Sequence, residues 1–183
     1  MKNFRLIRKG VDVTPLLAEI DQRPEAWLEQ TGRQAIRVQA AALAIPIRGL
    51  RKSKIRGRKR RDVHESRYTT ISRSFQNVRR FIEEFAMEID AKLARAKIVN
   101  LPPGKRVLAH RDRGEYYACR NRYHLVLESA EAWMRAGDEE VSMRSGELWW
   151  FDNKAVHEAW NSSEHRRIHL IFDLEPRVMS SSS

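Results

Sequence analysis

Three residues with metal-binding side chains stand out in the second half of the sequence. His110 and Asp112 are separated by one residue, so in an extended segment both side chains project to the same face. His157 offers a third ligand from a later segment. Two imidazoles and one carboxylate leave three positions open on an ion, which is the ligand set of non-haem Fe(II) oxygenases. The spacing therefore predicts an iron site.

An arginine follows this candidate site at a position where a charge needs a partner. Arg167 lies ten residues after His157 and opens the apolar segment Arg167-Ile-His-Leu-Ile-Phe. A guanidinium at the start of a strand directed into the core requires an anion. A dicarboxylate co-substrate held beside the iron would supply that anion.

Four short patterns follow one another in order between Leu101 and Pro176. They are Pro103-Gly104 six residues before His110, Arg120-Asn-Arg122-Tyr-His124, Trp149-Trp150-Phe151-Asp152, and His157-Glu-Ala-Trp160 with Arg167 beyond it. In this order and spacing they resemble the aspartyl/asparaginyl β-hydroxylase family of Fe(II)- and 2-oxoglutarate-dependent dioxygenases. The resemblance is weaker over the first 90 residues. It implies a double-stranded β-helix that holds the iron at one end of the barrel.

The resemblance also implies roles for four basic residues. Arg167 would pair with the distal carboxylate of 2-oxoglutarate. Arg122 and His124 would bind the same co-substrate or the adjacent substrate carboxylate, and Arg120 would belong to the substrate side of the pocket. The implied cofactors are Fe(II), 2-oxoglutarate as co-substrate and O2, with ascorbate as the reductant.

The sequence departs from the family at two positions. Animal enzymes of the family have glycine where Asp112 stands and use two histidines, whereas other relatives keep the carboxylate, so we take Asp112 as a ligand with His110 and His157. A serine that helps to hold 2-oxoglutarate falls, counted back from His110, on Val99. Asn100 or another group would have to replace it.

The pattern of apolar residues predicts an α+β domain. Phe75, Val78, Ile82, Phe85, Ile89 and Leu93 recur at helical spacing, and a second helix is expected to start at Thr14-Pro15. Short segments with a period of two follow, at 96–101, 106–110, 120–128, 139–143, 147–151 and 166–173. The prediction is one dioxygenase domain over 1–183: a helical N-terminal half of about 1–95 packed on the sheet, a cupin-like jelly roll over about 96–176, a basic loop at 51–62, and a flexible tail at 177–183.

The net charge of +11 in 183 residues is a local feature. Eight basic residues lie in 51–61, and without them 27 basic and 24 acidic residues remain. The run contains no aromatic residue for base stacking. A solvated loop, a patch that guides an acidic substrate, and a nucleic-acid contact all remain open for it, and nucleic acid is not favoured.

The composition limits the cellular compartment in which the protein is expected. No apolar run approaches the twenty residues of a transmembrane helix, and because Arg5, Arg8 and Lys9 interrupt the first ten positions we expect no signal peptide there. Cys119 is the single cysteine, so an internal disulfide is excluded. We expect a cytoplasmic protein without a membrane partner. The sequence does not define its oligomeric state.

Two functional hypotheses follow from these observations. The first is an Fe(II)- and 2-oxoglutarate-dependent hydroxylase acting on an aspartyl or asparaginyl residue of a peptide or protein, or on a related amino acid, with an acidic substrate expected. The second is a basic nucleic-acid- or ribosome-binding protein built on an inactive dioxygenase-like fold. Replacing His110 distinguishes them, because only the first hypothesis requires that side chain.

Overall fold

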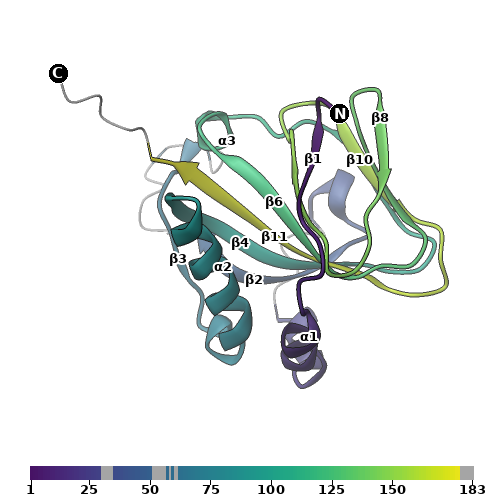
Figure 1. The fold of residues 1–183 in the computed structure, drawn as a ribbon, viewed down its shortest axis with the longest axis horizontal. Helices are drawn as coiled ribbons and strands as arrows, with labels where there is room; N and C mark the ends of the chain where they lie inside the picture. The colour runs from purple at the N-terminus through teal and green to yellow at the C-terminus, as the bar shows by residue number, and fades with distance from the viewer. Residues whose placement is uncertain (30–34, 51–56, 58, 60–61, 178–183) are drawn as a thin grey trace.

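The computed structural model describes residues 1–29, 35–50, 57, 59 and 62–177, and within them two antiparallel sheets form a jelly roll (Figure 1). The larger sheet has seven strands, in the order β1 (Phe4–Arg8), β9 (Leu148–Phe151), β6 (Asn121–Glu128), β11 (Arg167–Pro176), β4 (Ala91–Leu101), β2 (Leu43–Leu50) and β3 (Ser66–Tyr68). The smaller sheet has four, in the order β5 (Arg106–His110), β10 (His157–Asn161), β7 (Ala132–Ala136) and β8 (Glu139–Ser142).

Two helices cover one face of the seven-stranded sheet. α1 (Thr14–Asp21) and α2 (Gln76–Glu88) lie together on one side of this sheet in Figure 1, and the four-stranded sheet lies on the other. Val78, Ile82 and Phe85 of α2 pack against Leu125 and Phe172 of the sheet. The remaining helical elements are short: η1 (Pro24–Trp27), η2 (Arg37–Gln39), η5 (Ile71–Ser74) and α3 (Glu115–Ala118).

A second core fills the space between the two sheets. Val99, Val126 and Ile171 of the larger sheet meet Met134 and Ala159 of the smaller one there. Because side chains alternate along a strand, β11 presents two different faces. Ile168, Leu170 and Phe172 face the helices, whereas the alternate positions Arg167, His169, Ile171 and Asp173 face the interior. The barrel interior therefore carries buried polar groups.

The predicted helical N-terminal half is wrong. The first 95 residues hold β1, β2, β3 and the start of β4, so the domain is mostly β. α2 ends at Glu88, and Asp90 then adopts a left-handed conformation (φ 47°) that reverses the chain into β4. Leu93 continues the helical spacing by coincidence, because it belongs to that strand.

The predicted strand segments correspond to strands of the structure, including β5 at its predicted bounds, but β1, β3, β7 and β10 were not predicted. The basic run lies almost entirely outside the described residues, as do positions 178–183 of the predicted tail. No helix in the described part of the chain is long and apolar enough to cross a membrane.

Candidate metal centre and co-substrate pocket

The structure brings the three predicted metal ligands together at the end of the four-stranded sheet. His110 is the last residue of β5 and His157 is the first of β10, and the two are partners in the antiparallel register. Their ring centroids are 4.3 Å apart. Asp112 completes the group, and one ligand atom of each residue lies within 4.8 Å of the others.

Backbone carbonyls fix both imidazoles in the orientation that a metal requires. Nδ1 of His110 donates to the carbonyl oxygen of Leu108 at 2.7 Å, and Nδ1 of His157 donates to that of Ala155 at 3.0 Å. Each ring therefore turns its Nε2 lone pair toward the centre. Burial lowers the pKa of His157 to about 4, so this imidazole is neutral at pH 7 and able to coordinate.

The Asp112 carboxylate is held by two donors on the same oxygen. Nη1 of Arg122 and Nδ2 of Asn153 both donate to Oδ2, at 2.5 and 2.9 Å. Burial alone would raise the pKa of Asp112, but Arg122 and, to a smaller degree, His157 and Asn153 hold it at about 2. The group is therefore ionised, and Oδ1 is left as the oxygen for a metal.

Arg122 links Asp112 to a second buried carboxylate. Its Nε and Nη2 donate to Oδ1 and Oδ2 of Asp173 at 2.8 and 3.0 Å, and the Tyr116 hydroxyl donates to the same Oδ2 at 3.0 Å. Burial opposes the charge on Arg122, but the two carboxylates raise its pKa well above the usual value. In this structure Arg122 positions a metal ligand; its assignment to 2-oxoglutarate stays a prediction.

The other predicted co-substrate residues form a cluster inside the barrel. Arg167 and His124 are both buried, and His169 lies between them. Nη2 of Arg167 and Nδ1 of His124 each lie 3.2 Å from Nδ1 of His169. Burial lowers the pKa of both histidines well below the usual value, so the positive charge of the cluster resides on Arg167.

Arg120 pairs with a carboxylate of the chain itself. Its guanidinium is buried, and Nη2 pairs with Glu175 at 2.5 Å near the end of β11. Nη1 donates to the carbonyl oxygen of Tyr116 at 2.8 Å. The substrate-binding role of Arg120 stays a prediction.

The sequence did not reveal several residues of the site. Nε2 of Gln39, from η2, lies 3.3 Å from the metal-facing nitrogen of His110, and no motif indicates this contact. Asn153 and Asp173 were also missed. The only sequence signal for Asp173 is that it shares strand parity with Arg167; its pairing with Arg122 follows from the strand register, which the sequence does not show.

The family assignment rests on a match over most of the chain. The family model described as aspartyl/asparaginyl β-hydroxylase matches residues 59–176. The chain belongs to this family. No curated protein matches it at a significant level. The match includes all three residues of the metal centre and Arg167, and it confirms the resemblance found in the sequence.

Solved structures support the fold of this hydroxylase-family chain. It is similar to AviO1 from Streptomyces viridochromogenes Tue57, with a TM-score of 0.60 and 12% identity over 97% of this chain and 91% of the other. A Pseudomonas putida prolyl-4-hydroxylase has a TM-score of 0.55 and 12% identity over 97% of this chain and 95% of its own. A Burkholderia pseudomallei oxidoreductase of the 2OG-Fe(II) oxygenase family has a TM-score of 0.51 and 12% identity over 95% of this chain and 94% of its own. At these identities the likeness shows the fold alone.

The donor set fits the metal that the family implies. Two imidazoles and one carboxylate are the ligands of non-haem Fe(II) sites, and they leave room for a bidentate co-substrate and O2. The buried guanidinium of Arg167, in the same barrel interior, fits an anionic co-substrate. The protein is an Fe(II)- and 2-oxoglutarate-dependent hydroxylase.

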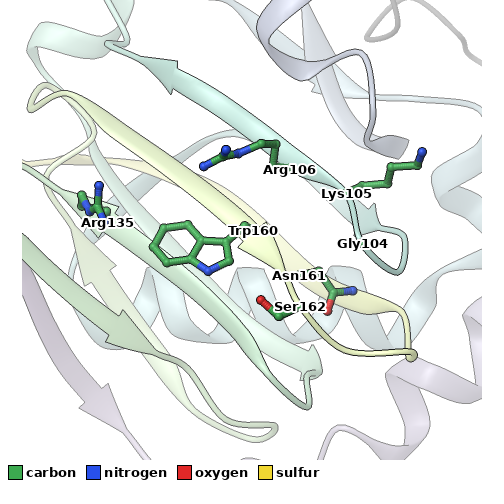
Figure 2. A pocket seen from close by; sticks show the side chains of 7 residues that line it. All are labelled: Gly104, Lys105, Arg106, Arg135, Trp160, Asn161 and Ser162. Atoms are coloured by element: carbon green, nitrogen blue, oxygen red, sulfur yellow. The ribbon is translucent and has the colours of Figure 1, made fainter.

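A surface pocket of about 460 Å³ lies on the other face of the four-stranded sheet (Figure 2). Trp160 of β10 lines it beside Arg135 and Arg106, and the guanidinium carbon of Arg135 is 5.4 Å from the indole centroid. Because Trp160 and His157 have opposite strand parity, this pocket does not open onto the metal centre. It is separate from the hydroxylase site.

Replacing Asp112 tests its assignment as a ligand. In Asp112→Gly we expect Fe(II) affinity to fall by about 10- to 100-fold, because a charged ligand is lost while the positive charge of Arg122, still paired with Asp173, stays near the site. Titration with Fe(II) or Mn(II) under anaerobic conditions measures this change. Unchanged affinity and turnover would show that the two histidines suffice.

Proposed function

We propose that the protein hydroxylates the β-carbon of an aspartyl or asparaginyl residue in an acidic peptide or protein, or of a related free amino acid. The supporting observation is the His110–Asp112–His157 group in a chain of the aspartyl/asparaginyl β-hydroxylase family. The chemistry that bound Fe(II) and 2-oxoglutarate supply is the activation of O2, with succinate and CO2 as the co-products.

The side chains of the protein bind the metal and the co-substrate, orient them, and keep water out of the barrel interior. His110, Asp112 and His157 would hold the metal, and the carbonyls of Leu108 and Ala155 keep both rings in the coordinating tautomer. Arg167 would bind 2-oxoglutarate from the barrel interior, where its side chain is shielded from water, and the assignment of His124 to the co-substrate stays a prediction.

The test measures succinate and substrate oxidation together. The protein is incubated with Fe(II), 2-oxoglutarate, O2 and ascorbate, and candidate acidic peptides and amino acids are examined for the mass gain of one oxygen atom. We expect succinate from wild type, none above background from His110→Ala, and normal formation from His165→Ala, an exposed histidine outside the site. In Arg167→Ala the Michaelis constant for 2-oxoglutarate is expected to rise by about 10- to 100-fold.

Wild-type protein that forms no more succinate than His110→Ala would contradict the hydroxylase proposal. It would favour the alternative of an inactive fold with a basic nucleic-acid-binding run. Oxidation of a substrate at a carbon other than the β-carbon would retain the enzyme class and overturn the proposed site of hydroxylation.

A further inference from the structure

One titratable group inside the barrel has no role in the function proposed above. His169 lies on β11, faces the interior between the two sheets, and is fully buried. Its contacts are with Arg167 on the same strand and His124 on β6. Buried polar groups are normally paired on every donor and acceptor, so the hydrogen bonds of His169 show whether it is a satisfied core residue.

The contact with Arg167 defines the tautomer of His169. A guanidinium can only donate hydrogen bonds, so Nδ1 of His169 accepts in the 3.2 Å contact with Nη2 of Arg167. His124 then donates from its own Nδ1 to the same lone pair, also at 3.2 Å. The proton of the neutral His169 ring must therefore be on Nε2.

That proton has no acceptor. Within the described part of the chain, Nε2 of His169 is buried and has no hydrogen-bond partner, and the same is true of Nε2 of His124. A buried donor without an acceptor costs free energy, and a structural core histidine would not need to carry that cost. The unpaired Nε2–H is instead typical of a binding site without its ligand.

The position of His169 agrees with this interpretation. In the register of β4 and β11, His169 is the partner of Val99, so the strand beside it offers an apolar side chain and no hydroxyl. Asn100, the polar neighbour of Val99, shares strand parity with Ile98 and so belongs to the face that carries the helices. His169 is thus the polar group that this part of the barrel wall presents beside Arg167.

We propose that His169 is a 2-oxoglutarate-binding residue, which with Arg167 recognises the distal carboxylate through its Nε2–H. The chemistry of the two residues selects the ligand class: a guanidinium and an N–H are both donors, and together they match the acceptor oxygens of a carboxylate. This inference rests on the proposed function, because it assigns another residue to the same co-substrate.

Direct binding to the metal-loaded protein tests the assignment without turnover. The Mn(II)-loaded protein is titrated in a calorimeter with 2-oxoglutarate and with 2-oxopentanoate, which has the same keto-acid end but no distal carboxylate. In His169→Leu we expect the affinity for 2-oxoglutarate to fall by about 10- to 100-fold, the usual effect of losing a hydrogen bond to a charged group. The affinity for 2-oxopentanoate is expected to change by less than about threefold.

Two further variants separate binding from folding. His169→Gln keeps an N–H donor near the position of Nε2, so it is expected to restore most of the 2-oxoglutarate affinity. Leu170→Val changes the next residue, which faces the helices, and is expected to lower the melting temperature without changing the preference between the two keto acids. Circular dichroism and thermal melting of every variant establish that the fold is retained.

Each outcome has a defined meaning. If His169→Leu binds 2-oxoglutarate as wild type does, or loses affinity for both keto acids equally, the assignment of His169 to the distal carboxylate is wrong while the proposed function stands. If wild-type protein loaded with metal binds neither keto acid, the proposed function itself fails and the assignment fails with it.

Discussion

The Asp173→Ala variant is expected to lose about 3 kcal/mol of unfolding free energy. Asp173 and Arg122 form a bidentate pair in which both side chains are almost completely buried. Removing one partner of such a pair leaves a buried charge without compensation, which costs about 3–5 kcal/mol. The lower end of this range applies here because Asp112 still accepts a hydrogen bond from Nη1 of Arg122. Urea denaturation of the metal-free protein measures the change.

An exposed ion pair provides the matched control. Asp21 pairs with Arg166 at 2.9 Å, but its side chain is 55% exposed to solvent. Solvent screening reduces such pairs to about 0–1 kcal/mol, so Asp21→Ala is expected to have little effect. Equal losses in the two variants would contradict the view that the buried Asp112–Arg122–Asp173 network stabilises this end of the barrel.

The metal-free protein is expected to lose stability steeply as the pH falls below about 6.5. Burial lowers the pKa of His124, His157 and His169, so all three take up protons more readily in the unfolded chain. The free energy of unfolding therefore falls in acid, by about 1.4 kcal/mol per pH unit for each such histidine. For His157, whose pKa falls from 6.5 to about 4, the loss reaches about 2 kcal/mol by pH 5.

Urea titrations between pH 7.5 and 5 test this prediction. In this window the Asp112 carboxylate stays ionised, since its pKa is about 2, so the histidines dominate the change. His169→Leu removes one of the three groups and is expected to flatten the pH dependence, whereas His165→Ala, at an exposed position, is expected to leave it unchanged. Stability that is constant or rises toward pH 5 would show that these imidazoles are not held neutral.

The sequence predicts strands well where one face is large and apolar, and poorly where the buried residues are polar or small. β11 was found because Ile168, Leu170 and Phe172 alternate with its polar residues. β10 was missed because its inward positions include His157 and Asn161, so the polar face is the buried one. β7 buries Ala132, Met134 and Ala136 and exposes Trp133, which reverses the usual contrast in size and hydrophobicity.

The same limit applies to the site. Residues that share a motif, such as His110, Asp112 and His157, could be identified from their spacing together with the family resemblance. Asp173 and Gln39 reach the site only through strand pairing and the packing of η2 against β5, which local sequence does not encode. The role of Arg122 also depends on tertiary structure, since motif and family indicate an arginine there but not which carboxylates it contacts.

Because His110 lies in the smaller sheet, a bound metal would also stabilise the edge of that sheet. β5 is an edge strand of that sheet and pairs with β10 alone among its strands. A single ion bound by His110 and His157 would link β5 to β10, as a covalent cross-link would. Iron depletion would then loosen β5 and expose main-chain groups that can pair with another chain.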